Sequence, residues 1–290
     1  MAGQFATGAP PGTIIVRPLP ERTNFNRWII AIVILVIVVM AILFGLIYQS
    51  SAIVSTRNFS YSTPGDQGVN YTLQITNVNG AVTLESWSQD NFLINGTVTA
   101  KGLGSSPGQV NLVNSSLNGN IILQAIFPNN AVFLISQTYS VRINVFVPVS
   151  VQVGKLAVDN VNGLIQASGL NVTGASFFSE NGDIDFDCSL CGNGGFSAQT
   201  TNGNIGGTFS APVIGGNHTM STQNGNLQVS VPSSSSFKLT ASLVNGSIQT
   251  SNLVLTQETK TSTQITATVG TGTGNLRLST VNGQISIKGT

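Results

Sequence analysis

The dipeptide Asn-Gly, followed by any residue and then by an apolar one, recurs ten times in this chain. The apolar fourth residues are Val82, Val98, Ile121, Ile165, Ile184, Phe196, Ile205, Leu227, Ile248 and Ile285. Most of the Asn residues are evenly spaced: positions 162, 181, 202, 224 and 245 lie 19, 21, 22 and 21 residues apart. A fixed period of about 20 residues is typical of a stacked repeat, in which each unit buries its apolar side only against its neighbours.

The residues after each Asn-Gly alternate in polarity. Apolar Ile184 and Phe186 face one way, with Asp185 between them. Since Asn-Gly tolerates the backbone of a tight turn, and since period-two alternation indicates a strand, the pattern predicts strands joined by stacked turns. The longest alternation covers 141–153, where we expect Pro148 to mark a strand end or edge. The outward residue Asn204 is expected to tolerate replacement by Asp.

The predicted ectodomain is all-β. We expect a β-solenoid-like stack of about 21-residue repeats, because stacked equivalent turns explain one recurring turn sequence and let the Asn side chains form a ladder. A β-sandwich is the alternative, since it also has short strands and frequent turns. The expected divisions are a cytoplasmic disordered tail (1–27), a transmembrane helix (28–48), a linker (49–65), an irregular β section (66–154) and a regular β-repeat section (155–290).

The segment from Trp28 to Tyr48 contains no charged residue. At about 1.5 Å of rise per residue it is long enough to span a hydrocarbon core of about 30 Å, with aromatic residues at both ends. It exceeds the apolar core of a cleaved signal peptide, so we expect an uncleaved anchor in contact with membrane lipid. Three Arg residues precede the span and Arg57 follows it, which predicts a cytoplasmic N-terminus and an extracellular segment from residue 49 to residue 290.

Charged residues make up 7% of the chain, and its net charge is +1. This composition offers no basic patch, so nucleic acid is not an expected partner. A coat of Ser, Thr and Asn replaces the charges, in a manner similar to archaeal surface proteins. On an exported chain, the Asn-x-Ser/Thr sequons are candidate N-glycosylation sites. They are Asn58, Asn70, Asn95, Asn114, Asn171, Asn217 and Asn245.

The segment around residue 185 holds the candidate sites for a metal and for a disulfide. Asp183, Asp185 and Asp187 share the outward face of one predicted strand and form a weak candidate calcium site; a solvated acidic face is the alternative. Cys188 and Cys191 are the cysteines of the chain. Outside the cytoplasm we expect a local disulfide between them rather than a redox or zinc site, because a βαβ context and further zinc ligands are missing.

Searches for catalytic motifs find no GxSxG sequence and a single histidine, His218, within a sequon. We interpret His218 as a surface-turn residue. The Lys and Arg residues of the predicted strands are scattered, so they build no catalytic groove. No catalytic or cofactor-binding residue is expected, and no cofactor.

From about residue 139 onward the chain resembles the putative-adhesin family of surface proteins, also described as toastrack-like. The resemblance is carried by YSVRINVFVP, LAVDNVNGLIQASGL, SENGDIDFD, TTNGNIGG, STQNGNLQVSVPSSSSFKLTASLVNGSIQTS and GTGTGNLRLSTVNGQISIKG. It implies a repetitive β-stack, often attached to a membrane, without an established enzymatic activity.

Together these observations predict a non-enzymatic, single-pass cell-surface protein. Its rigid β-repeat ectodomain would serve adhesion or envelope assembly, through a surface glycan, a protein partner or self-association. An accessory or sensory subunit of a membrane complex is the second hypothesis, and a solenoid carbohydrate-active enzyme is the third.

Overall fold

The computed structural model describes residues 23–51, 53–129, 137–188, 194–213 and 215–290. The chain divides into two compact units, of which the first ends at Gln49 and the second runs from Ser50 to Thr290.

The first unit contains one helix, α1 (Thr23–Ser51). Its segment Arg27–Gly45 has a mean hydropathy of 3.2, and none of it is buried against protein. At about 1.5 Å per residue this segment extends for about 28 Å, close to the thickness of a bilayer core. The helix is therefore long and apolar enough to cross a membrane.

The second unit is built from strands, apart from the short 3-10 helix η1 (Pro107–Gln109). The strands are β1 (Val54–Pro64), β2 (Tyr71–Asn79), β3 (Val82–Trp87), β4 (Asn91–Lys101), β5 (Asn111–Leu117), β6 (Asn120–Ile126), β7 (Thr138–Pro148), β8 (Val153–Asn162), β9 (Ile165–Leu170), β10 (Val172–Asn181), β11 (Ile184–Cys188), β12 (Phe196–Asn202), β13 (Ile205–Phe209), β14 (Asn217–Asn224), β15 (Leu227–Val231), β16 (Phe237–Ser251), β17 (Leu255–Lys260), β18 (Gln264–Val269) and β19 (Gly274–Gly289).

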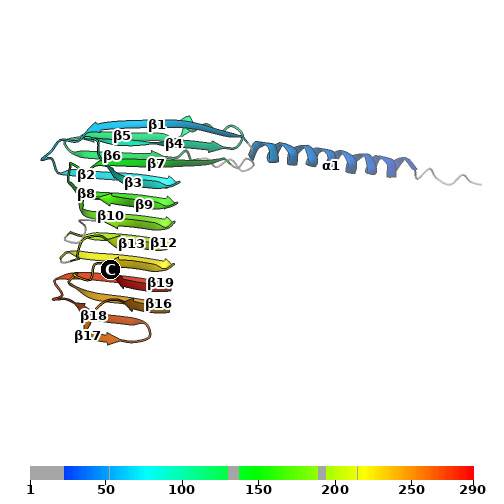
Figure 1. Ribbon diagram of the computed structural model, residues 1–290. Helices are drawn as coiled ribbons and strands as arrows, with labels where there is room; N and C mark the ends of the chain where they lie inside the picture. Colours follow the sequence, from blue (N-terminus) through cyan, green and yellow to red (C-terminus); the bar gives the residue numbers. More distant parts are fainter. Residues whose placement is uncertain (1–22, 52, 130–136, 189–193, 214) are drawn as a thin grey trace, which may run out of the picture. The chain divides into compact units, whose positions relative to one another are not determined.

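The strands form rungs that stack one on another (Figure 1). A rung is a strand, an Asn-Gly corner and a second strand, as in β2–β3, β8–β9, β10–β11, β12–β13 and β14–β15. The long strands β16 and β19 each supply a whole rung. The first strands of the rungs pair in parallel and make a first layer, and the second strands make a second layer in the same way. This arrangement confirms the predicted solenoid-like all-β fold.

The core lies between the two layers. Inward residues alternate along each strand: buried residues alternate with exposed ones along β11, and with half-buried or exposed ones along most of β2. The apolar residue after each corner is at the centre of this core: Val82, Ile165, Ile184, Ile205 and Ile285 are all fully buried. The predicted in-and-out assignment is therefore confirmed at these corners.

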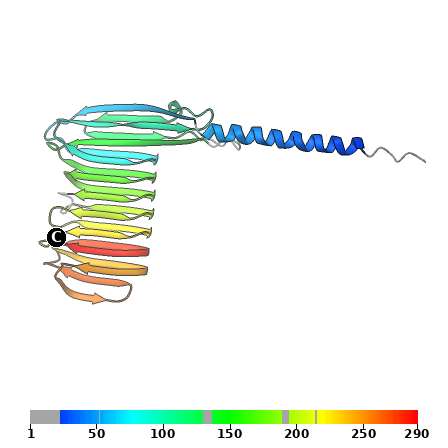
Figure 2. The same ribbon diagram turned by 45° about the vertical axis from the view of Figure 1, so that its right-hand side comes forward.

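The rungs do not stack in chain order. The C-terminal strand β19 pairs with β14 and β15 on one side and with β16 on the other. In Figure 2 the red β19 accordingly lies between the yellow β14–β15 rung and the orange β16. The last segment of the chain is therefore inserted between two rungs that precede it in the sequence.

Antiparallel strands cover the ends of the stack. At the N-terminal end β4 and β1 extend the second layer, and β5 extends the first. At the C-terminal end β18 and β17 extend the first layer beyond β16. β1 occupies most of the segment 49–65 that was expected to be a linker, and the regular rungs already begin at β2, so no boundary separates residues 154 and 155.

Pro148 ends β7, as the sequence predicts. The alternation does not continue as one strand to residue 153, because the chain turns after Pro148 and leaves Val149 55% exposed before β8 begins. Pro148 itself is buried.

Candidate functional site

The corners carry a continuous ladder of Asn side chains. Nδ2 of Asn181 donates to Oδ1 of Asn162 at 2.9 Å, and Nδ2 of Asn202 donates to Oδ1 of Asn181 at 2.8 Å. The ladder runs through seven residues, which in spatial order are Asn79, Asn162, Asn181, Asn202, Asn224, Asn282 and Asn245. Each amide both donates and accepts within the ladder except at its ends, so the ladder ties successive rungs in register.

The glycine of each corner is required by close packing. A Cβ at Gly203 would overlap the carbonyl group of Gly182 in the neighbouring rung, and a Cβ at Gly225 would overlap the carbonyl group of Gly203. The Asn of the motif therefore provides the ladder, and the Gly lets adjacent corners approach each other.

The remaining Asn-Gly pairs have other roles. Asn95 lies within β4, and Asn118, with a φ of 50°, forms the turn between β5 and β6. Asn118 and Gly119 both have positive φ, which the hairpin turn requires. Asn193 lies outside the described residues.

A column of buried polar residues lies just inside the corners, two positions before six of the seven ladder Asn residues; Leu243 takes this position before Asn245. Thr200 Oγ1 donates to the Gly182 carbonyl at 2.9 Å, and Thr222 Oγ1 donates to the Gly203 carbonyl at 2.9 Å. The members are Asn77, Asn160, Ser179, Thr200, Thr222 and Thr280, all at most 4% exposed. The sequence signal for this column, an Asn, Ser or Thr two residues before the Asn-Gly of six corners, is a second repeat that the Asn-Gly pattern alone does not reveal.

A second ladder links the residues that directly follow the corner glycines of four neighbouring rungs. Oδ1 of Asp183 accepts from the backbone N–H of Asn204 at 2.7 Å, and Oδ1 of Asn204 accepts from the N–H of Asn226 at 2.9 Å. Oδ1 of Asn226 continues the ladder to the N–H of Gln284. Asn204 is thus outward but bonded on both sides. A carboxylate at this position would face that of Asp183, so the structure favours a destabilising effect of Asn204→Asp over the neutral one expected from the sequence.

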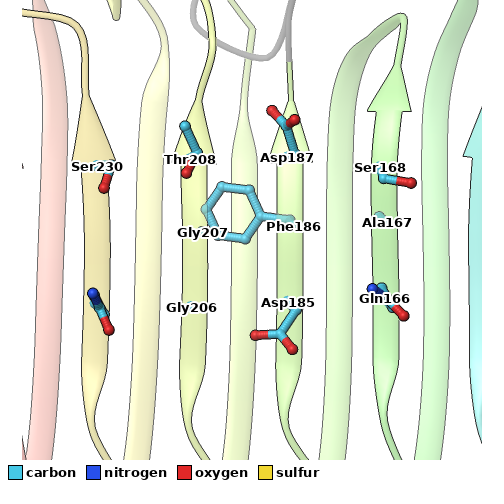
Figure 3. Close-up of a pocket in the computed structure, with 11 residues that line it drawn as sticks. Gln166, Ala167, Ser168, Asp185, Phe186, Asp187, Gly206, Gly207, Thr208 and Ser230 are labelled. Atoms are coloured by element: carbon cyan, nitrogen blue, oxygen red, sulfur yellow. The ribbon is translucent and has the colours of Figure 1, made fainter. Parts of the chain in front are cut away.

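The outer face of the second layer is hollowed over β9, β11, β13 and β15. The hollow has a volume of about 370 Å³ and forms where Gly206 leaves a gap between Asp185 and Gln228. Figure 3 shows Asp185 and Asp187 on one strand, with Gln166 and Ser168 on the strand beside it. The hydrogen-bonding side chains that line the hollow are Gln166, Ser168, Asp185, Asp187, Thr208, Gln228 and Ser230.

The carboxyl group of Asp185 is the titratable group of this hollow with a shifted pKa. Partial burial raises its pKa, and the neighbouring charge of Asp183 raises it further. Both effects disfavour the ionised form, so a proton or a hydrogen-bond donor from a ligand is favoured at this carboxyl group.

The weak calcium candidate gains no support from the geometry. Asp183 accepts bonds from Asn204, and Asp187 accepts a short hydrogen bond from the Ser210 hydroxyl. Within the described ranges, no group of three or more His, Cys, Asp or Glu side chains could hold a metal ion. We interpret the three carboxylates as part of the polar outer face.

Cys188 ends β11 as a buried residue that faces the core. Cys191 lies outside the described residues. The disulfide between the two stays a prediction.

His218 is buried, and its interpretation as a surface-turn residue is wrong. It belongs to β14, is 1% exposed, and its ring lies edge-on to Phe209 with centroids 5.3 Å apart. Nε2 lies 2.8 Å from the carbonyl oxygen of Gly215. The adjacent sequon residue Asn217 is exposed, because neighbouring residues of a strand face opposite ways.

The candidate glycosylation residues are not equivalent. Asn58, Asn70, Asn114, Asn217 and Asn245 are exposed, whereas Asn95 and Asn171 are half-buried. Nδ2 of Asn245, the atom to which a glycan would be attached, donates to Asn282 in the ladder. Glycosylation at any of the seven stays a prediction.

The fold and the corner ladders define a solenoid-like β-repeat protein. Its outer face, over the part of the chain that the structure describes, is polar but carries few charges. The family model Toastrack DUF4097 matches residues 73–288, and the chain belongs to this family. No curated protein matches the chain.

Several solved structures match most of the chain at low sequence identity. One is a putative cell adhesion protein from Clostridium sporogenes ATCC 15579, with 10% sequence identity over 81% of this chain and 100% of the other and a TM-score of 0.44. Another is a putative adhesin from Bacteroides fragilis NCTC 9343, with 10% identity, 82% and 98% coverage and a TM-score of 0.34. A putative lipid binding protein from Parabacteroides distasonis ATCC 8503 has 10% identity, 82% and 98% coverage and a TM-score of 0.24.

Proposed function

We propose that this protein is a non-enzymatic, single-pass cell-surface protein that presents a rigid β-stack for adhesion or envelope assembly. Support for the anchor comes from the apolar and unburied segment Arg27–Gly45. Support for the orientation comes from the three Arg residues that precede the apolar run, because positive charges are enriched on the cytoplasmic side. In this arrangement the N-terminus is cytoplasmic and the second unit is extracellular.

The observation that carries the presenting role is the Asn ladder, which passes through every rung of the stack. Together with the parallel pairing of both layers, it fixes the spacing of outer-face side chains from rung to rung. A surface fixed in this way loses little conformational entropy on binding, which favours a recognition role.

The hollow on the second layer is the surface that we propose for ligand contact. Its amide, hydroxyl and carboxyl groups match the alternating donors and acceptors of sugar hydroxyls, and these groups come from four neighbouring strands. A surface glycan is therefore the ligand class that the hollow supports best.

The test compares the wild-type protein with a variant whose hollow is filled. Gly206→Gln adds a side chain on the outer face, where a Cβ meets only the carboxylate end of Asp185. We expect this variant to lose at least tenfold in affinity for glycans that the wild-type protein retains from a surface-polysaccharide panel. Thr83→Gln, in the same outer row but on β3, is the matched control and should bind normally. Equal binding by all three proteins would contradict the assignment.

The two other hypotheses are separated by related measurements. A stoichiometric partner recovered from a pull-down in mild detergent would favour an accessory or sensory subunit of a membrane complex. Cleavage of a retained glycan would favour a carbohydrate-active enzyme, and the binding assay should therefore include analysis of soluble products.

A further inference from the structure

The second layer ends at its C-terminal side on a strand edge that no described residue covers. The second half of β16, residues 246–251, pairs with β19 along one side. β18 pairs with the first half of β16 alone, and β17 pairs with β18. Along the described chain, no strand therefore follows the second half of β16 in this layer.

The backbone donors of this edge point away from the stack. In the inner rungs, the N–H of the corner glycine and that of the apolar fourth residue both donate to the next rung. Examples are Gly203 N–H to Asn224 O at 3.0 Å and Ile205 N–H to Asn226 O at 2.9 Å. Gly246 and Ile248 are the equivalent residues of β16, and by the same register their N–H groups face the position of a further strand.

The edge also leaves apolar surface uncovered. Ile248 is 9% exposed, whereas its counterparts Ile205 and Ile285 are fully buried. Val244 is 62% exposed and Val254 is 80% exposed, and both lie beside residues 246–251 in the chain.

The first layer also ends at its C-terminal side on a strand edge, that of β17, but this edge is protected from pairing. β17 carries Glu258 and Lys260, and Gln257 has a φ of 53° within a register shift. Charges and bulges of this kind prevent a strand edge from pairing with another chain. Residues 244–254 contain no charge and no proline, so this edge has no such protection.

We infer that the second half of β16 is a self-association edge, which pairs antiparallel with the same edge of a second copy of this chain. An uncharged edge suits a copy of itself, because identical edges then meet without like-charge repulsion, and a two-fold pair satisfies the free donors of both copies. The directions of the N–H groups place Ile248 opposite Ile248 of the second copy and Gly246 opposite Thr250. This pairing closes the core over Ile248 and gives the outward N–H groups acceptors.

The edge lies far along the stack from β1, the first strand of the second unit. Nine strand-to-strand steps of about 4.8 Å, roughly 43 Å, separate β1 from β16 in the second layer. Self-association there would leave the N-terminal end of the stack and the hollow free.

The test measures the mass of the full-length protein in detergent micelles across a range of concentrations, with the detergent contribution subtracted. Two variants block the edge. Thr250→Pro removes an N–H that faces away from β19, and Gln249→Lys places a charge at the edge. Thr83→Lys, in the same outer row but on β3, six strand-to-strand steps from β16, is the matched control. Circular dichroism and thermal unfolding verify that each variant is folded.

We expect a concentration-dependent dimer for the wild-type protein and for Thr83→Lys, and a dissociation constant at least tenfold higher for both edge variants. A wild-type protein that is monomeric at the highest concentration reached would overturn the proposal. So would a dimer that is unaffected in folded edge variants, because another surface or the apolar helix would then make the contact.

Discussion

The side chain of Asn202 donates a hydrogen bond to Oδ1 of Asn181, which lies 21 residues earlier in the chain and 2.8 Å away in space. The same spacing separates the repeated corners, so one sequence period equals one rung. Since the backbone N–H of Gly182 also bonds to the Asn202 carbonyl at 3.0 Å, side chain and main chain fix the same register. The corner is therefore where substitutions should be most informative.

Gly203→Ala should strongly destabilise the stack. The added Cβ would overlap the Gly182 carbonyl group, and backbone atoms must shift to make room. We expect a loss of about 2–4 kcal/mol in the free energy of unfolding, measured with chemical denaturant. Gly206→Ala is the control, because its Cβ meets only the flexible end of Asp185. Similar losses in both variants would show that close approach at the corner is not the cause.

Thr222→Val should show how much a hydrogen bond of the buried polar column contributes to stability. Valine keeps the shape of the side chain and removes the bond to the Gly203 carbonyl. The expected loss is about 1–2 kcal/mol of unfolding free energy. Ser179→Ala supplies the contrast, because the buried Ser179 hydroxyl has no hydrogen-bond partner in the structure. Removal of the Ser179 hydroxyl should be neutral or stabilising. A loss equal to that of Thr222→Val would contradict the claim that the hydrogen bond of Thr222 stabilises the protein.

Asn204→Asp should destabilise the protein at neutral pH, by about 1 kcal/mol, because the new carboxylate faces that of Asp183. This repulsion raises the folded-state pKa of the pair, so the loss should disappear as the pH falls through that raised pKa. Asn226→Asp is the control, since its Oδ1 accepts from Gln284 N–H and its ladder neighbour is an amide. Thermal unfolding at several pH values measures both, and a pH-independent loss would contradict the explanation.

Asp185→Asn should remove a pH dependence. Because the pKa of Asp185 is raised in the folded protein, its ionised form lowers stability, and wild-type stability should gain relative to the variant as the pH falls through the raised pKa toward the ordinary value of about 4. The group is largely exposed, so the difference at neutral pH should stay within about 1 kcal/mol in favour of the variant. A variant that is less stable than the wild-type protein at pH 7 would contradict the sign.

The sequence predicts the corners well because their requirements are local. Positions such as Asn202, Gly203 and Ile205 each meet one steric or hydrogen-bonding need that repeats in every rung, so periodicity reveals both the fold and the ladder. His218 could also have been placed correctly: it has the same parity as Met220 and Thr222, and this alternation is better evidence than the sequon beside it.

The insertion of β19 could not be predicted in this way. The 37 residues between Asn245 and Asn282 fit nearly two periods, but they contain one hairpin and a strand that returns to pair with β14 and β15. That pairing depends on which exposed edge is available when the last segment docks, and no local pattern encodes it. The hollow could not be predicted from local sequence either. Gly206 leaves a gap only because Asp185 and Gln228, which are distant in sequence, lie on either side of it.

The most direct test of the proposed function is the topology of the protein in intact cells. One protein carries an epitope tag before Met1 and another carries it after Thr290, and both are stained with antibody before and after permeabilisation. The proposal predicts that the C-terminal tag is stained on intact cells and that the N-terminal tag is stained only after permeabilisation. A C-terminal tag that stays inaccessible until the membrane is opened would contradict an extracellular stack, and with it the adhesive role.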